Sequence, residues 1–442
     1  MPPFSRAIRR PGLYYIAPTY LKCHVMQRSI SAIMTSVTKR VPIPPKGVDY
    51  RGKIVLAPMV RSGELPSRLL ALHYGADLVW GPETVDRSLI GTTRKVNEAL
   101  NTIDFTRFPS NGAKTPQKDQ KESLIYRLHP EREGSRLIFQ IGTSDPERAV
   151  QAARIVAGDV AGIDVNAGCP KPFSTSGGMG AALLQTPDIL ASILEALVKE
   201  IVPEFQIGIS VKIRLLETPE LTEVLVRKLC ATGITALTIH CRTTPMRPRE
   251  RAIREQLKMI ADICRETGVA CLINGDVANR AQAEQLISEF GADGAMIATA
   301  AESNPSCFRT GADGGLAPWE EVVEQYIKTS MEVGNRWGNT KYLLAHLIPG
   351  KLQALKNITS TKSYHQVCQI LGLEHLETQA KEVDERLGIT PETEYQGRKG
   401  KKGKNNNSAL AAGGNQGKAR HGQKKSLSKR GIPEQAAAVA NV

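Results

Sequence analysis

AGIDVNAGCPKPFSTSGGMGAALL, residues 161–184, is the most informative stretch of this sequence. It opens with an apolar run at residues 162–166, which is typical of a buried strand. The chain then breaks at Gly168, presents Cys169 and turns at Pro170. A polar loop with three glycines follows, and a helical pattern resumes at residues 181–184. A thiol just after a buried strand, beside such a loop, is where an enzyme can hold a reactive group.

Similar strand-like runs recur on both sides of this stretch. They lie at residues 54–60, 76–81, 137–142, 162–166, 207–213, 236–241, 270–275 and 294–298. Helical patterns fill most of the intervals, at residues 64–74, 146–157, 188–198, 221–232, 253–267 and 280–290. Strands that alternate with helices pair in parallel, so the sequence predicts an α/β fold, a (β/α)8 TIM barrel. A doubly wound open sheet is the alternative, but no G-x-G-x-x-G follows the first strand.

In a barrel of this kind the chemistry lies at the carboxyl ends of the strands. The residues expected there are Pro58, Met59, Val60, Gln140, Asn166, Cys169, Lys212, Arg214, His240, Arg242, Asn274, Gly275, Asp276, Ala298 and Thr299. Lys212 and Arg214 are two positions apart, as are His240 and Arg242, so each pair lies on one side of its strand. A single polar residue at a strand end is usually a solvated rim residue. Polar groups at most of the strand ends together indicate an active site.

The motifs DVNAGCP and STSGGMGAALL, residues 164–170 and 174–184, resemble the active-site segment of the tRNA-dihydrouridine synthases. The resemblance covers about residues 53–387 and is closest to the branch that modifies position 20 of the tRNA D-loop. It implies a flavoprotein oxidoreductase with FMN that reduces the 5,6-double bond of a uridine, using NADPH or NADH. It also implies that Cys169 is the proton donor.

The resemblance assigns roles to the strand-end residues as well. Pro58, Met59 and Val60 would line the flavin ring, Gln140 and His240 would contact it, and Lys212 would lie at its pyrimidine edge. Asn274, Gly275, Asp276, Ala298 and Thr299 would hold the phosphate. Asn166, Arg214 and Arg242 would contact the uridine or its phosphates. Two positions depart from the family pattern. Thr299 stands where the family usually has arginine, and Cys241 replaces a frequent glycine and should point away from the pocket.

Residue chemistry supports the role of Cys169 independently. A thiol has an unperturbed pKa near 8.5 and is mostly protonated at neutral pH, so it can act as an acid. The alternative is a buried, inert thiol. The chain has eight cysteines and no C-x-x-C pair, which argues against structural zinc and a disulfide framework. Cys230, Cys241, Cys264 and Cys271 lie in apolar runs and should pack as small hydrophobic residues.

The charge of the chain is concentrated at its ends. The net charge is +14, yet residues 1–40 contain seven Lys or Arg and residues 398–430 contain eleven, both without any acid. The remainder is therefore slightly acidic. No run approaches the roughly 18 apolar residues of a membrane span, so no membrane association is expected.

Four segments follow from these patterns. Residues 1–48 form a basic extension whose composition predicts a mitochondrial presequence, with further cytoplasmic or nuclear pools; a disordered basic arm is the alternative. Residues 49–314 form the FMN-binding barrel. Residues 315–390 form a helical domain that is either a packing module or, by the resemblance, a tRNA-binding domain using Lys341, Lys351, Lys356 and Lys362. Its helices are expected at residues 320–334, 339–347, 351–357, 365–371 and 377–387.

Residues 391–442 are low in complexity and rich in Gly and Lys, so they should not fold alone. They predict a disordered tail that binds phosphates non-specifically, or one that serves nuclear localisation or solubility.

Three functions compete for the whole chain: a tRNA reductase, an FMN barrel acting on a small pyrimidine or enone, and a non-catalytic RNA-binding protein. The first explains most features, and it implies a monomer with tRNA and NADPH as partners and no metal.

Overall fold

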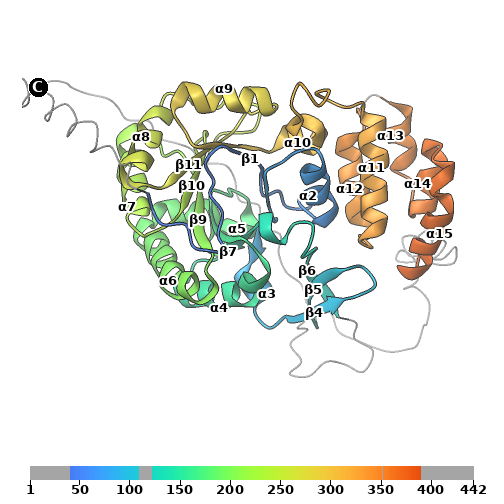
Figure 1. Cartoon of the computed structure of the whole chain (residues 1–442), viewed down its shortest axis with the longest axis horizontal. Coiled ribbons are helices and arrows are strands. Elements are labelled where there is room, and N and C mark those ends of the chain that lie inside the picture. The colour runs from blue at the N-terminus through green and yellow to red at the C-terminus, as the bar shows by residue number, and fades with distance from the viewer. Residues whose placement is uncertain (1–39, 109–121, 351, 390–442) are drawn as a thin grey trace, which may run out of the picture. The chain divides into compact units, whose positions relative to one another are not determined.

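The computed structural model describes residues 40–108, 122–350 and 352–389, and eight parallel strands form a closed barrel within it (Figure 1). The strands are β1 (Lys53–Leu56), β2 (Leu78–Trp80), β7 (Leu137–Gly142), β8 (Gly162–Ala167), β9 (Gly208–Arg214), β10 (Ala236–His240), β11 (Ala270–Asn274) and β12 (Gly294–Ile297). Each pairs with the next in parallel, β12 pairs with β1, and the β2–β7 pairing completes the ring. The predicted TIM barrel is confirmed, and the open sheet is wrong because no strand of the ring is left at an edge.

Helices cover the outside of the barrel. They are α2 (Leu65–His73), α3 (Asp86–Leu89), α4 (Pro146–Val156), α5 (Pro172–Thr175), α6 (Pro187–Phe205), α7 (Pro219–Cys230), α8 (Leu257–Thr267), α9 (Arg280–Phe290) and α10 (Thr299–Ser303). Their starts follow from local sequence. Asp145, Thr218 and Asn279 each accept a hydrogen bond from the backbone N–H of the third residue of the helix that follows. All six helices expected in the barrel are present.

Side chains along each strand alternate between two environments. On β8, Ile163 and Val165 face the outer helices and belong to the main hydrophobic core. Asp164 and Asn166 are buried on the opposite face, inside the barrel. The lower interior is filled by apolar residues such as Val55, Trp80, Ile138, Leu272 and Met296. Polar groups are therefore concentrated toward the carboxyl ends of the strands.

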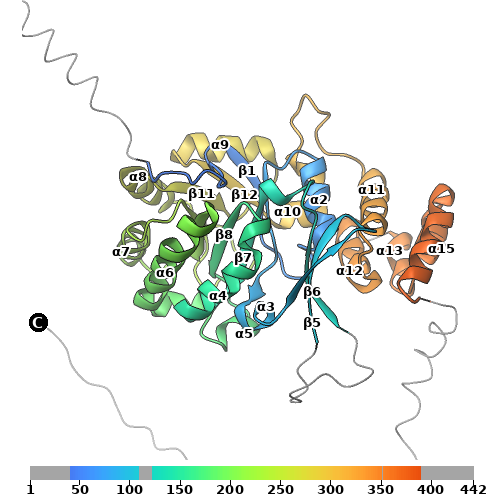
Figure 2. The same ribbon diagram turned by 60° about the horizontal axis from the view of Figure 1, so that its bottom comes forward.

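A three-stranded antiparallel sheet interrupts the barrel between β2 and β7. It consists of β4 (Thr93–Asn97), β5 (Thr102–Arg107) and β6 (Ser123–Leu128), and a short strand, β3 (Thr84–Val85), precedes it and pairs with β7. Figure 2 shows this sheet beside the barrel and not within it. The sequence analysis did not predict it. Arg127 on β6 donates to Asp104 on β5 and to the carbonyl of Val333, which links the sheet to the helices that follow the barrel.

Five helices follow the barrel: α11 (Trp319–Glu332), α12 (Trp337–Leu347), α13 (Gln353–Ile358), α14 (Tyr364–Leu371) and α15 (Glu377–Arg386). All five were predicted to within a few residues. They enclose a separate hydrophobic core, to which Leu70 of α2 and Tyr74, directly after α2, also belong. The boundary expected at residue 314 stays a prediction, because the chain divides only after Thr390 and the barrel and these helices share one unit.

Several predictions concern segments outside the described residues. These are the presequence in residues 1–39, the tail in residues 391–442, and the phosphate contact of Lys351. Among the helices that the structure describes, none is long and apolar enough to cross a membrane.

Candidate active site

A cavity of about 580 Å³ opens at the carboxyl ends of the barrel strands. A second cavity of about 500 Å³ continues from it, and Arg214, His240, Asn274 and Ala298 line both. Both volumes are typical of sites for small molecules and cofactors. The first cavity contains the predicted residues Pro58, Val60, Gln140, Asn166, Cys169, Lys212, Arg214, His240, Asn274 and Ala298. The second adds Arg242, Gly275, Asp276 and Thr299. Met59 lines neither cavity and packs against the hydrophobic cores.

Strand register explains why these residues meet. Asn166 on β8 is paired with Lys212 on β9. His240 on β10 is paired with Arg214 on one side and with Asn274 on the other. Residues paired in register on a parallel sheet point to the same face, so these side chains form two adjacent layers inside the barrel mouth.

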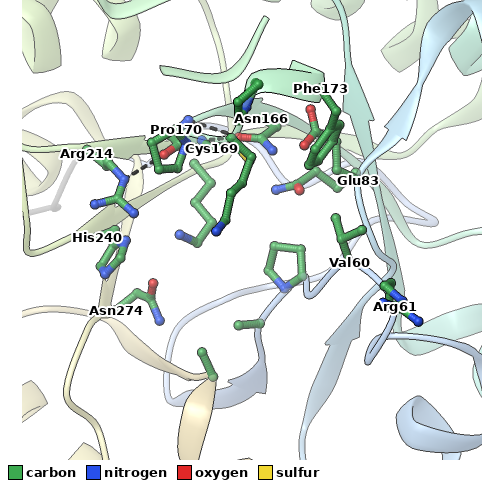
Figure 3. Close-up of a pocket in the computed structure, with 18 residues that line it drawn as sticks. Val60, Arg61, Glu83, Asn166, Cys169, Pro170, Phe173, Arg214, His240 and Asn274 are labelled. Carbon is green, nitrogen blue, oxygen red and sulfur yellow. Dashed lines mark hydrogen bonds between the residues drawn. The ribbon is translucent and has the colours of Figure 1, made fainter. Parts of the chain in front are cut away.

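Cys169 is presented by a turn that two other predicted residues hold in place (Figure 3). The Asn166 side-chain oxygen accepts hydrogen bonds from the backbone N–H groups of Gly168 and Cys169, both at 3.0 Å. Arg214 Nε donates to the carbonyl of Gly168 at 2.6 Å. Gly180 has φ +57°, and a Cβ there would lie 2.6 Å from the Cys169 carbonyl, so only glycine lets the loop return this closely. Asn166 and Arg214 therefore position the thiol, a role that the sequence analysis did not assign to them.

Glu83 also lines this cavity and was missed by the sequence analysis. Its carboxylate follows β2 and accepts a hydrogen bond from Ser174 at 2.7 Å. Burial raises the pKa of Glu83, while hydrogen bonds from Ser174, Cys169 and Asn166 partly oppose that shift. Burial also raises the pKa of Cys169, and the charge of Glu83 raises it further. A carboxyl directly after the second predicted strand was the signal that could have identified it.

The other wall of the site is cationic. Burial, followed by the charge of the neighbouring Arg214, lowers the pKa of Lys212 to about 8. Burial, followed by the charges of Lys212 and Arg214, lowers the pKa of His240 to about 2, so its imidazole is neutral at physiological pH. Several positive groups gathered around a neutral imidazole favour an anionic ligand.

A buried carboxyl lies beneath this wall. Burial raises the pKa of Asp164 to about 6. It accepts hydrogen bonds from Gln140 at 2.8 Å and from Ser210 at 2.7 Å. The first of these bonds fixes the orientation of the Gln140 amide at the floor of the cavity.

Arg242 makes structural contacts that the sequence did not indicate. Its side chain is 6% exposed and bonds to Asp276 at 2.5 Å and to the carbonyls of Pro248 and Glu250. These contacts hold the loop after β10 against the end of β11. Its contact with substrate stays a prediction. Cys241, as expected, points away from the site into the main hydrophobic core.

Three exposed residues complete the mouth of the first cavity and were not singled out as a group from the sequence. Phe173 and Val60 are 49% and 45% exposed, and Arg61 lies beside Val60. Figure 3 shows Val60 and Arg61 on the opposite side of the cavity from His240 and Arg214. In the described residues, no group of three or more His, Cys, Asp or Glu side chains could hold a metal ion.

Comparison with known proteins identifies relatives of this chain. Residues 55–369 match the family model described as "Dihydrouridine synthase (Dus)". The chain is 48% identical over 343 residues to a tRNA-dihydrouridine(20) synthase [NAD(P)+] of Schizosaccharomyces pombe, covering 76% of this chain and 68% of that protein. It is 45% identical over 331 residues to the Saccharomyces cerevisiae protein of the same name, covering 73% and 84%.

A lower similarity relates the chain to a solved structure. That structure is a DHODH from Eimeria tenella in complex with ferulenol, at 16% identity and a TM-score of 0.36, covering 64% of this chain and 88% of that one.

Proposed function

The chain belongs to the dihydrouridine synthase family, and we propose that it reduces the 5,6-double bond of a D-loop uridine in tRNA, at position 20, with FMN as cofactor and NADPH as reductant. The names of the two fungal relatives support this substrate and position. The observation that carries the proposal is that Cys169 lines one cavity together with Lys212, His240 and Asn274. One site thus contains an acid suited to protonating carbon and a cationic wall suited to a phosphorylated cofactor.

The residues present fit FMN. Lys212, the neutral His240 and the fixed amide of Gln140 offer a cation and hydrogen-bonding groups to a polar ring edge. The second cavity would hold the phosphate beside Gly275 and Thr299. Gly275 has φ +108°, and a Cβ there would lie 3.1 Å from the His240 ring, so the missing side chain keeps this space clear. The chemistry that FMN supplies when bound is hydride transfer to carbon 6 of the uracil ring.

Cys169 provides the second hydrogen. Reduction of the double bond also requires a proton at carbon 5, and the Cys169 thiol would donate it. Because burial and Glu83 both raise its pKa, the thiol stays protonated at neutral pH. Asn166 and Arg214 fix the turn that carries it, which reduces the cost of aligning the acid with the base. The exposed rings and methyl groups of Phe173 and Val60 form an apolar rim that can exclude water from the bound uracil.

The remaining roles are also part of the proposal. The helices α11 to α15 would bind the body of the tRNA, and the basic residues after 391 would add non-specific phosphate contacts. The enzyme would act as a monomer. The basic, acid-free N-terminal residues would direct it to mitochondria, with a further cytoplasmic or nuclear pool. Fusing residues 1–48 to a fluorescent protein tests targeting, and a uniform cytosolic signal would contradict it.

The decisive experiment is single-turnover oxidation of the bound, NADPH-reduced flavin by an unmodified tRNA transcript. Wild type should react rapidly and form one dihydrouridine, located at position 20 by primer extension. Cys169→Ala should bind flavin normally and react about 10² to 10⁴ times more slowly, the usual contribution of a general acid. A transcript with cytidine at position 20 should leave the reduced flavin untouched.

Other outcomes select the competing functions. A reduced flavin that reacts with free uracil or an enone but not with tRNA would indicate a small-molecule oxidoreductase. A purified protein that binds no flavin would indicate a non-catalytic RNA-binding protein. Equal rates for wild type and Cys169→Ala would leave the reaction in place but remove Cys169 as the acid.

A further inference from the structure

A third cavity of about 460 Å³ lies where the barrel meets helices α12 and α13. We name it the α12 cavity. It is lined by Arg61 of the barrel and by ten residues of the helical region, among them Trp337, Lys341, Tyr342, Thr361 and Lys362. Its walls thus combine aromatic rings with cationic side chains.

Arg61 joins this cavity to the active site. It is the one described residue that lines both the first cavity and the α12 cavity. Its guanidinium lies 4.0 Å from the centroid of the Tyr342 ring, a cation–π contact between the barrel and α12. Its backbone has φ +72°, a conformation that residues other than glycine rarely adopt and that tends to persist at functional sites. A strained, exposed arginine is therefore held at the point where the two cavities meet.

The charged side chains that line the α12 cavity are all positive. Arg61, Lys341 and Lys362 line it, and none of the described residues that line it is acidic. Lys341 donates to the carbonyl of Thr361 at 2.8 Å, so its ammonium is held in place by an uncharged acceptor. Burial lowers the pKa of Lys341, and the nearby Lys362 lowers it further. An anion in the cavity would offset both effects.

We propose that the α12 cavity binds one nucleotide of the RNA strand, next to the uridine that enters the barrel. Its base would stack on the Arg61–Tyr342 pair, and its phosphate would lie near Lys341. Aromatic rings and arginine planes are the surfaces on which proteins stack unpaired RNA bases, while lysines contact the backbone. This inference rests on the proposed function, since it requires a uridine in the first cavity.

The position of the cavity favours RNA over the dinucleotide reductant. Figure 3 shows Arg61 across the active-site cavity from His240 and Asn274. Those two residues lead to the second cavity, where a cofactor phosphate would lie. The α12 cavity is therefore on the side away from the phosphate end, and it borders the helices proposed to bind tRNA. An RNA strand whose target base lies in the barrel would pass Arg61 before it reaches the α12 cavity.

The test is a double-mutant cycle between the protein and the RNA. The protein is varied between wild type and Tyr342→Ala. The RNA is varied between the normal transcript and two transcripts that carry a single abasic residue, directly 5′ or directly 3′ of the target uridine. Binding is measured by competition on the flavin-loaded protein. Tyr342→Ala should weaken binding of the normal transcript about 10-fold. For wild type, one of the two abasic transcripts should also bind about 10-fold more weakly than the normal transcript. That abasic transcript should bind Tyr342→Ala with nearly the same affinity as it binds wild type, because the stacking contact is already lost.

Matched variants separate this role from a fold defect. Tyr342→Phe keeps the ring and should restore most of the affinity. Lys341→Ala should weaken binding of every transcript, whereas Lys199→Ala, which removes an 83% exposed cation on α6, should not. Flavin content and the rate of flavin reduction by NADPH should stay at wild-type values in Tyr342→Ala.

Three results would overturn the proposal. The first is that, for both abasic transcripts, the loss of binding free energy from the abasic residue and the loss from Tyr342→Ala add in full. The second is an unchanged affinity in Tyr342→Ala, and the third is slower reduction by NADPH with unchanged RNA binding, which would assign the cavity to the dinucleotide. The proposed function fails separately, when wild-type reduced flavin does not react with the normal transcript at all.

Discussion

Burial raises the pKa of the Cys169 thiol, and the carboxylate of Glu83, which lines the same cavity, raises it further. Glu83 is itself fixed by a hydrogen bond from Ser174, which lies on α5 shortly after Cys169. A reactive cysteine that attacks as a nucleophile requires the opposite arrangement, a cationic neighbour that lowers the pKa. The pairing with a carboxylate therefore fits a thiol that donates a proton.

Replacing Glu83 by glutamine should shift the pH dependence of proton donation to lower pH. Loss of the negative charge stabilises the thiolate, so the pKa of Cys169 falls and the thiol loses its proton earlier as the pH rises. The measurement is the rate of single-turnover flavin oxidation by tRNA between about pH 6 and pH 10, with the alkylation rate of Cys169 as a direct measure of thiolate.

Ser174→Ala is the control for this prediction. It removes the hydrogen bond to Glu83 but leaves the charge, so the pKa of Cys169 should stay raised. Superimposable pH profiles for wild type and Glu83→Gln would show that Glu83 does not act on the thiol.

The barrel could be predicted from sequence because each strand is a short apolar run and most of the strands are followed by a helical pattern. The antiparallel sheet could not, since β4 is almost wholly exposed and its residues, TRKVN, contain one apolar side chain. The five helices after the barrel were located from sequence to within a few residues.

The place of a residue in the cavity could be predicted where its position at a strand end is sufficient, as for Cys169, Lys212 and His240. It was not predictable where the role depends on a turn or on packing. The substrate contact of Asn166 stays a prediction, and the structure adds that its side-chain oxygen caps the turn of Cys169. The stacking of Arg61 on Tyr342 joins residues far apart in the chain, and only the folded structure brings them together.

Arg68 and Glu133 form a buried ion pair whose disruption should destabilise the fold. Their side chains are 1% and 0% exposed, and Arg68 donates to both Glu133 oxygens at 2.7 Å. Arg68→Met would leave the Glu133 charge buried and unpaired, so the free energy of unfolding should fall by about 3–5 kcal/mol. Urea denaturation followed by circular dichroism measures this.

The matched control is Arg94→Met. Arg94 pairs with Asp159 but is 45% exposed, so solvent screens the interaction and the loss should be less than about 1 kcal/mol. An equal fall in the free energy of unfolding for Arg68→Met and Arg94→Met would mean that burial does not determine how much breaking an ion pair destabilises the fold.

Thr299→Arg should tighten FMN binding. Thr299 lines the second cavity, at a position where arginine is usual in the family. Arg242 lines the same cavity, but its guanidinium already bonds to Asp276 and to backbone carbonyls. An added guanidinium should supply a charge-assisted hydrogen bond to the phosphate and lower the dissociation constant about 10-fold. Quenching of FMN fluorescence on titration with apoprotein measures the constant, and Thr299→Val should bind more weakly than wild type. Unchanged or weaker binding by Thr299→Arg would show that the phosphate lies elsewhere.

Lys212 should give FMN binding a pH dependence centred near its own pKa. Burial and Arg214 lower that pKa to about 8, so the ammonium is present below this pH and is lost above it. His240 contributes nothing in this range because its pKa is about 2. The affinity of the apoprotein for FMN should therefore fall as the pH rises through about 8. In Lys212→Arg the guanidinium keeps its charge, so affinity should change little over the same range. Fluorescence titrations at a series of pH values test this, and parallel profiles for the two proteins would exclude Lys212 as the titrating group.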